Sequence, residues 1–262
     1  MVSGELRLRP PSLRRLCMRV RWMLWTPRAH PSWPPRRWAV LVAAVITVVA
    51  VAAGVDWLGA GPDVDPRVRA MAERVLAELE AIPVSATRAH RDDYERSAFG
   101  SAWTDAVTVA GGRNGCDTRN DVLTRDLDEV RAGPVADCPR GVLAGELRSP
   151  YTGEFVVFRR DRAASAVQID HIVPLAYAWD MGAWSWPPDK RQDFANDPAN
   201  LVAVDGESNQ AKSDTEPARW MPPERGFWCQ YAIQFVTVAA AYGVMLDAAS
   251  AETLGEALRD TG

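Results

Sequence analysis

The chain has 262 residues, 47% hydrophobic and 24% charged, which is typical of a globular protein with one or two domains and a sizeable core. Its net charge of −4 is unevenly distributed. Residues 1–55 hold nine arginines and one acid, so residues 56–262 carry 21 basic against 33 acidic side chains, a charge of −12. This acidic remainder argues against broad, sequence-independent adhesion to a polyanion, which requires a basic surface. Contact with nucleic acid would have to be local.

The N-terminal part contains an uncharged hydrophobic run at 38–55. It follows a basic, Pro- and Arg-rich segment at 1–37, and Ala50-Val51-Ala52 is a candidate cleavage site. A run of 18 residues is at the lower limit of a membrane span and longer than a usual signal-peptide core. Because the arginines remain in the cytoplasm, both interpretations place the rest of the chain outside it. We therefore expect a secreted or membrane-anchored protein; a buried core helix is the alternative.

A short linker at 56–65 leads into one domain, predicted to span 66–262. Pro66 suits a first helical turn, and apolar residues then repeat at helical spacing from Val68 to Ile82, with charges between them. This pattern predicts an amphipathic helix that packs on the domain. Residues 91–115 mix aromatics with glycines and end in a turn-rich segment.

Three cysteines lie beyond the hydrophobic run. Cys116 and Cys138 bracket a polar stretch with little core of its own, and a disulfide between them would stabilise the fold by roughly 3 kcal/mol. A zinc site is less favoured, because there is no CxxC pair and no histidine near these thiols. Cys229 is left over and is predicted to be a buried thiol.

Short strands and helices alternate in the second half of the chain. Two β-like runs at 154–160 and 166–170 predict a hairpin or a pair of neighbouring strands. A helix near 175–182, an irregular or part-helical connection at 187–200 and a third strand at 201–204 follow. The chain then turns through Asp205-Gly206 into a short helix, and apolar residues at helical spacing predict another helix along 228–242.

Five polar residues fall at the ends of these elements. Asp170 and His171 end a strand, Asn200 precedes the next strand, and Asn209 and Lys212 lie on the helix after it. A unit of strand, loop, strand and helix can bring such side chains into one cleft. Carboxylate and amide oxygens are ligands for Mg²⁺ or Mn²⁺, and a neutral imidazole can take a proton from an attacking water. The group therefore suits hydrolysis of a phosphodiester.

These residues carry a family resemblance. "DHIVPL" followed by "NDPANLVAVDGESNQAK" resembles the HNH endonuclease signature with asparagine in the last position. The blocks "GCDTRNDVLTRDL", "SPYTGEFVVF" and "VQIDHIVPLAYAWDMGAW" are similar to exported HNH endonuclease family proteins of actinobacterial type, over roughly residues 91–240. The resemblance implies an α+β fold with a ββα-metal core and flanking helices.

The resemblance also implies a role for each residue. His171 would be the general base, Asp170 and Asn209 the metal ligands, and Asn200 the residue that holds the histidine loop. Lys212 would contact the scissile phosphate or stabilise the transition state. Each has a structural alternative: a turn cap for Asp170, a core histidine bonded to a carbonyl for His171, a loop tie for Asn200, and a helix cap or surface residue for Asn209.

Departures from the family pattern narrow the choice of metal ion. HNH enzymes often carry histidine where this chain has Asn209, so a hard cation, Mg²⁺ or Mn²⁺, is favoured over zinc or nickel. Arg119 and Arg125 could contact phosphate. Pairing with nearby aspartates on a solvated face is the favoured alternative for both arginines.

The leading hypothesis is an exported or membrane-anchored, metal-dependent endonuclease that cuts DNA, with RNA as an alternative substrate, and that is a monomer. A second hypothesis is a non-catalytic envelope-associated protein that keeps the HNH fold to bind a partner or cell-wall polymer, which the charge of −12 favours. Another class of metal-dependent hydrolase is disfavoured, because the chain has no HExxH motif and no second histidine near His171.

Overall fold

A computed structural model of the protein describes residues 66–260. Its fold is mixed α+β, as predicted. The predictions for the basic segment at 1–37, the hydrophobic run at 38–55 and the linker at 56–65 lie outside the described residues. Between residues 66 and 260, no helix is both long and apolar enough to cross a membrane.

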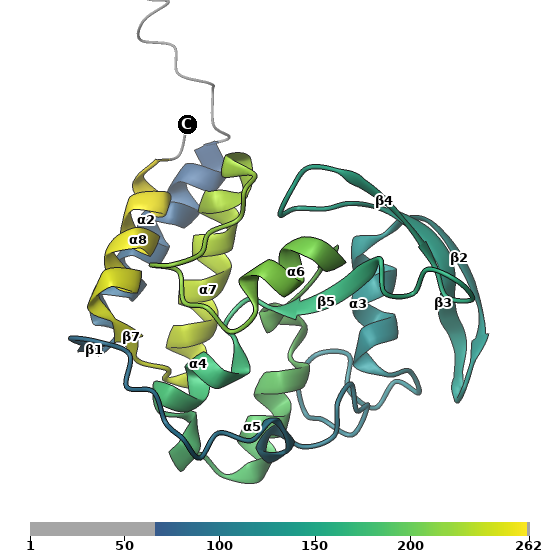
Figure 1. Cartoon of the computed structure of the whole chain (residues 1–262), viewed down its shortest axis with the longest axis horizontal. Helices are drawn as coiled ribbons and strands as arrows, with labels where there is room; N and C mark the ends of the chain where they lie inside the picture. Colours follow the sequence, from purple (N-terminus) through teal and green to yellow (C-terminus); the bar gives the residue numbers. More distant parts are fainter. Residues whose placement is uncertain (1–65, 261–262) are drawn as a thin grey trace, which may run out of the picture. The chain divides into compact units, whose positions relative to one another are not determined.

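Three long helices pack against one another on one side of the domain (Figure 1). They are α2 (Pro66–Ala81), α7 (Trp228–Tyr242) and α8 (Ala248–Arg259). Their apolar faces belong to the larger of two hydrophobic cores. Asp247 caps α8 by accepting a hydrogen bond from the Ser250 amide at 2.9 Å, and β1 (Val84–Ser85) pairs with β7 (Leu246–Asp247) beside it. The helices predicted from Pro66 and along 228–242 are confirmed.

The strands form small separate sheets. β2 (Asp128–Val135), β3 (Cys138–Arg148) and β4 (Phe155–Arg159) make an antiparallel sheet of order β2-β3-β4. β5 (Val167–His171) pairs antiparallel with β6 (Leu201–Asp205), with His171 opposite Leu201. The runs at 154–160 and 166–170 both form strands, as predicted, but they do not pair with each other as a hairpin. β4 takes β3 as its partner, and β5 takes a strand that begins about thirty residues later.

Short helices connect the strands. After β5 come α4 (Leu175–Asp180), a 3-10 turn η2 (Ala183–Ser185), α5 (Pro188–Asn196) and a second turn η3 (Pro198–Asn200). α6 (Gly206–Lys212) follows β6 directly. Two further 3-10 turns are η1 (Arg96–Phe99) and η4 (Arg225–Phe227). The predicted helices near 175–182 and after Asp205-Gly206 are confirmed, and the part-helical connection is η2, α5 and η3.

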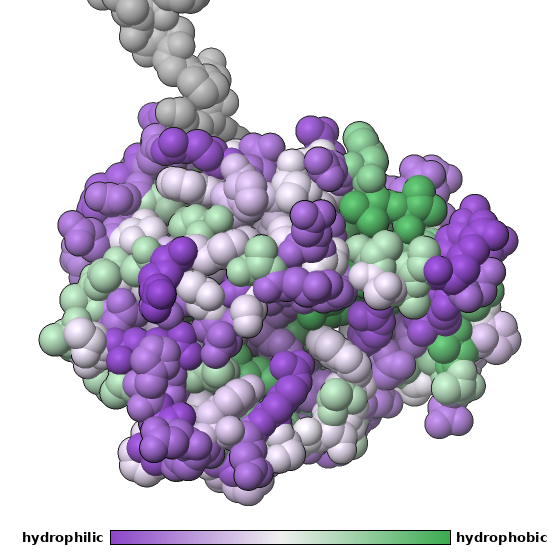
Figure 2. All heavy atoms as spheres, in the orientation of Figure 1, coloured by the Kyte–Doolittle hydropathy of each residue, from purple (hydrophilic) through white to green (hydrophobic). Residues whose placement is uncertain are grey.

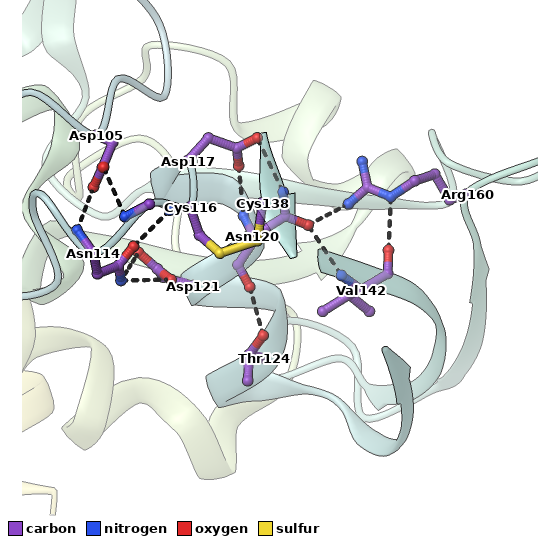
Figure 3. The surroundings of a disulfide bond; sticks show 11 residues. Asp105, Asn114, Cys116, Asp117, Asn120, Asp121, Thr124, Cys138, Val142 and Arg160 are labelled. Atoms are coloured by element: carbon purple, nitrogen blue, oxygen red, sulfur yellow. Dashed lines mark hydrogen bonds between the residues drawn. A yellow bond between two sulfur atoms is a disulfide. The ribbon is translucent and has the colours of Figure 1, made fainter. Parts of the chain in front are cut away.

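A disulfide closes the region before β3 (Figure 3). It joins Cys116, just before α3 (Thr118–Asp126), to Cys138 at the start of β3, which confirms the predicted bridge. Around it, the Asn120 Oδ1 accepts hydrogen bonds from the Val142 amide at 3.1 Å and from Arg160 at 2.6 Å. These contacts fix α3 against the β2-β3-β4 sheet. Cys229 is a free thiol, but it is only partly buried, because it lies near the start of α7 at the edge of the core.

Apolar atoms gather on the surface where β4 lies (Figures 1 and 2). Phe155 and Val157 of β4 are 76% and 51% exposed, because the face of this strand opposite the core has no further layer over it among the described residues. The remainder of the view in Figure 2 is mostly hydrophilic.

Candidate functional site

The polar residues of the predicted site come together because β5, β6 and α6 form one unit. Asp170 and His171 are the last two residues of β5, and both are buried, at 6% and 7% exposure. α6 starts immediately after β6, and the Asp205 side chain caps it by accepting from the Ser208 amide at 2.8 Å. Burial would raise the pKa of Asp205, but hydrogen bonds from Ser149 and Ser208 outweigh it and hold that pKa below its ordinary value.

Asn200 fixes the backbone that follows His171. Its side chain is fully buried, its Oδ1 accepts from the Val173 amide at 2.8 Å, and its Nδ2 donates to the Val173 carbonyl at 3.3 Å. The Asn200 backbone carbonyl also accepts from the Ile172 amide at 2.8 Å. The loop after β5 is thus held by three hydrogen bonds to one residue, which sets where the imidazole of His171 lies.

The imidazole of His171 is oriented by a backbone carbonyl. Its Nε2 lies 2.9 Å from the Ala195 carbonyl oxygen, and since a carbonyl can only accept, Nε2 carries the proton. Nδ1 is then the unprotonated nitrogen, and it has no hydrogen-bond partner among residues 66–260. Burial lowers the pKa of His171 to about 3, against the raising effect of the Ala195 bond, and the charges of Arg96 and Lys212 lower it further. The ring is therefore neutral at physiological pH.

Lys212 holds Asp170 from inside the domain. Its Nζ lies 2.8 Å from Asp170 Oδ2 and 2.8 Å from the His171 carbonyl oxygen, and its side chain is fully buried. The Tyr151 hydroxyl also donates to Asp170 Oδ2. The expected contact of Lys212 with a scissile phosphate does not fit this geometry, because the ammonium faces Asp170 and has no exposed surface.

A cavity of about 450 Å³, called the cleft below, opens beside these residues. Its lining includes Asp170, His171, Asn209, Arg96 and Ser213. The Asn209 Nδ2 donates to Gln168 Oε1 at 2.8 Å, which leaves the Asn209 Oδ1 available to coordinate a metal ion. The structural alternative for Asn209, a helix cap, is not seen, since Asp205 caps α6.

The oxygens of Asp170 and Asn209 suit only part of a metal site. No group of three or more His, Cys, Asp and Glu side chains that could hold a metal occurs in the described part of the chain. One carboxylate and one amide oxygen on a shared cleft match Mg²⁺, which keeps several waters and takes substrate phosphate oxygens as further ligands. They do not match a closed zinc site with four protein ligands.

Two residues of the site were not predicted. Arg96 lines the cleft, and its guanidinium forms no hydrogen bond or ion pair within residues 66–260. The Trp103 indole stacks on the His171 ring with centroids 5.8 Å apart and planes 14° apart. Both come from the aromatic and glycine-rich stretch 91–115, and neither belongs to a motif whose spacing indicates chemistry.

Arg119 and Arg125 lie elsewhere. The Arg119 guanidinium donates to the carbonyls of Ala164 and Val167 at 3.1 and 3.0 Å, and burial lowers its pKa. Arg125 pairs with Asp126 and donates to the carbonyls of Pro198 and Leu201, both at 2.7 Å. Neither arginine lines the cleft. The pairing alternative therefore describes Arg125, and Arg119 bonds to backbone instead of to aspartates.

Comparison with known proteins defines the class of this domain. The family described as "GmrSD restriction endonucleases, C-terminal domain" matches residues 117–244, which include every residue from Asp170 to Lys212. The matched region is thus a nuclease-type domain. An uncharacterized secreted protein of Arthroderma benhamiae is 38% identical over 166 residues, which cover 63% of this chain and 74% of that protein. No solved structure matches.

The chain belongs to the family of the GmrSD restriction endonuclease C-terminal domain. The HNH-related resemblance drawn from the sequence motifs is confirmed by this membership. Residues 66–116, including Arg96 and Trp103, lie before the matched region.

Proposed function

We propose that the protein is an exported, divalent-metal-dependent endonuclease that hydrolyses phosphodiester bonds of DNA. The observation that carries this proposal is the His171 ring, which donates through Nε2 to the Ala195 carbonyl while Nδ1 is left to accept a proton. The ring borders the same cleft as Asp170 and Asn209. In this proposal, β5, β6 and α6 are the ββα-metal core of an HNH enzyme.

His171 acts as the general base. Its neutral Nδ1 takes a proton from the water that attacks the phosphorus, the bond from phosphorus to the leaving oxygen breaks, and that oxygen takes a proton from solvent. The Ala195 carbonyl stabilises the positive charge that forms on the ring. A pKa of about 3 makes the free ring a weak base, and its first cause is burial. A phosphate bound in the cleft brings negative charge beside the ring, which raises the pKa of His171 toward the working pH.

Asp170 and Asn209 would hold the cation. A bound Mg²⁺ or Mn²⁺ would supply positive charge to the phosphate oxygens as they become more negative in the transition state. Lys212 and Tyr151 fix the Asp170 carboxylate, so its position in the cleft is set before a ligand arrives. Asn200 fixes the His171 loop and acts through that residue, not on the substrate.

Export is supported by independent features. The fungal relative is described as a secreted protein. The protein also has a disulfide, Cys116–Cys138, and disulfides persist in oxidising environments outside the cytoplasm. The hydrophobic run at 38–55, after a basic segment, predicts the signal or anchor that would take the domain across the membrane.

Nicking of a supercoiled plasmid by the purified full-length protein tests the proposal. We expect cleavage with Mg²⁺ or Mn²⁺, less with Ca²⁺ or Zn²⁺, and none with EDTA; an RNA transcript in parallel reactions reports on the alternative substrate. His171→Gln keeps an N–H for the Ala195 carbonyl but cannot accept the proton, and should lower the rate about 10²–10⁴-fold. His90→Gln, at an exposed histidine, is the matched control and should leave the rate unchanged. Undiminished cleavage by His171→Gln would refute the proposed mechanism.

A further inference from the structure

A second cavity, of about 250 Å³, also borders His171, and its lining does not include Asp170 or Asn209. We call it the side cavity. Most of its wall is residues 96–103, and Leu175, Ala195, Asn196 and His171 complete it. Its size is just below the range of about 300–1,000 Å³ typical of pockets for drug-sized molecules, so it suits a single small ring system.

Aromatic side chains give the side cavity its chemical character. Phe99 is anchored in the core against Phe194 and Trp179, with ring centroids 6.0 and 6.1 Å apart. Trp103 is half-buried and stacks on His171. Its backbone φ of 57° is in the left-handed region, which a bulky residue rarely adopts. Such a conformation persists only where surrounding contacts enforce it, and here the Trp103 carbonyl accepts from the Thr118 amide at 3.2 Å.

A buried polar atom in the wall lacks a partner. The Asn196 Nδ2 donates to the Gln192 carbonyl at 2.9 Å, which fixes the orientation of the amide. Its Oδ1 is buried and has no hydrogen-bond partner among the described residues. An unpaired buried acceptor costs stability in the free protein. Asn196 is one of the residues of the side-cavity wall, so this unpaired acceptor lies in the wall.

Arg96 links the side cavity to the cleft. It lines both, it is exposed, and its guanidinium has no partner within residues 66–260. An unpaired guanidinium beside a reacting phosphodiester is suited to a bidentate contact with phosphate oxygens. In a domain with an excess of acidic residues, this is a local positive charge at the site where a polyanion must enter.

We propose that the side cavity is a subsite for one unstacked nucleobase next to the bond that is cut, with Arg96 on the phosphate that joins this nucleotide to the cleft. The inference rests on the proposed nuclease function and specifies its substrate. Stacking on aromatic rings tolerates any base. A base can enter only after leaving the duplex stack, so the enzyme prefers single-stranded or locally unpaired nucleic acid.

The wall is built before substrate arrives. The Arg191 Nε donates to the Ala98 carbonyl at 2.8 Å, and Gln192 donates to the Ala106 carbonyl at 2.9 Å. Gly100 has a φ of 80°, and a Cβ there would lie 2.5 Å from the Gln192 Oε1, so the segment sits directly on α5. A preformed wall lowers the entropy that is lost when a nucleotide binds.

Abasic substitution in a defined substrate tests the subsite with the wild-type full-length protein. The substrate is a short single strand in which one linkage is a phosphodiester and the others are phosphorothioates. An abasic residue on one side of the cleavable bond should raise KM about tenfold with little change in kcat, whereas an abasic residue at a remote position should leave KM unchanged. The same sequence as a duplex should be cut more slowly than the single strand.

Arginine variants test the phosphate contact. Arg96→Gln should raise KM about tenfold, and Arg96→Lys should recover part of the loss because it keeps the charge. Arg140→Gln, at an exposed arginine of β3 that lines neither cavity, is the matched control and should behave as wild type. Equal KM values for the adjacent and remote abasic substrates would overturn the subsite while leaving the nuclease proposal in place. Failure to cut any of the substrates would overturn both.

Discussion

Two regions of very different construction border the same histidine. One is the strand-strand-helix unit of β5, β6 and α6, in which a backbone ladder and buried polar contacts hold Asp170, His171 and Lys212. The other is the wall segment, residues 96–103, which contains no strand and is held by the Arg191 side chain of α5, bonded to the Ala98 carbonyl. The first lies within the region matched by the family, and the second precedes it.

The contrast separates two tasks of the site. In the strand-strand-helix unit, Asp170, His171 and Lys212 are almost fully buried, and the charges of Asp170 and Lys212 are paired with each other. In the wall segment, Arg96 is exposed and unpaired among the described residues, and Trp103 is half-buried. Buried, paired groups keep one geometry, whereas exposed groups on a loop contact what enters. Changes in the first region should therefore alter stability and kcat, and changes in the second should alter KM.

The largest expected effect is the loss of the buried ion pair. Lys212→Met removes the ammonium and leaves the Asp170 carboxylate buried beside the Tyr151 hydroxyl without a cation. Breaking such a pair costs ~3–5 kcal/mol of unfolding free energy. Urea unfolding followed by tryptophan fluorescence measures this loss.

The only other lysine provides the control for that variant. Lys190 donates to the Tyr242 carbonyl at 2.7 Å from a partly exposed position, so Lys190→Met should cost about 1 kcal/mol. If Asp170 binds a cation, millimolar Mg²⁺ or Mn²⁺ should restore part of the stability of Lys212→Met and none of that of Lys190→Met. Equal destabilisation by the two variants would show that the Asp170–Lys212 pair does not hold the strand-strand-helix unit.

The disulfide has the next largest expected effect, and it acts on the other region. Cys116 lies just before Thr118, whose amide and hydroxyl bond to the carbonyls of Trp103 and Thr104. Replacing Cys116 and Cys138 by serine opens a loop with a sequence separation of 22, which should cost roughly 3 kcal/mol. Because the end of the wall segment is then less restrained, KM for nucleic acid should rise more than kcat falls. Cys229→Ser, which replaces a free thiol, should change neither KM nor kcat.

Asn200 provides a smaller effect within the strand-strand-helix unit. Asn200→Ala removes the acceptor for the Val173 amide and the donor for its carbonyl, and leaves both buried, at a cost of about 1–3 kcal/mol. The His171 loop is then free to move, so kcat should fall while KM stays near the wild-type value. Asn200→Asp keeps the acceptor, so its kcat should lie between the values of wild type and Asn200→Ala. An Asn200→Ala protein with normal kcat would contradict the positioning role.

The amino-acid pattern identifies the strand-strand-helix unit because its signals are local. Strand-like runs end at Asp170 and at Val204, and Asn209 and Lys212 lie about one turn apart on the short helix that follows. The Cys116–Cys138 bridge was also predictable, since both thiols flank a stretch that lacks its own core. Such features depend on neighbours within a few residues.

What could not be predicted depends on contacts between distant residues. β4 pairs with β3, which has few alternating apolar residues and contains Gly141 and Gly145, so its 11 residues gave no strand signal. The pairing of Lys212 with Asp170 and of Arg125 with Asp126 and two carbonyls decides that neither cation faces the cleft. Arg96 and Trp103 reach His171 only because α5 holds the wall segment across it.

Acid should destabilise the protein because His171 is buried. The pKa of this ring is lowered by burial to about 3, from an ordinary value of 6.5 in the unfolded chain. Below pH 6.5 the unfolded state therefore binds a proton that the folded state does not, and the free energy of unfolding decreases as the pH falls. Between pH 6.5 and about pH 3, the free energy of unfolding falls by up to ~1.4 kcal/mol per pH unit. The stability that the neutral ring gives is fully present only above pH 6.5.

A histidine variant isolates this contribution from the carboxylates. Asp205 also has a lowered pKa, but the stability that it gives is lost only as the pH falls below its ordinary value of 3.8, so the two windows are separate. Urea unfolding between pH 7 and pH 4.5 should give a smaller pH slope for His171→Gln than for wild type, because the variant keeps the N–H donor for Ala195 and has no group that titrates there. If His171→Gln showed the same pH slope as wild type, the imidazole would be reached by solvent and protonated in the folded state. The ring would then not be buried and oriented by the Ala195 carbonyl, which both the base role and the side cavity require.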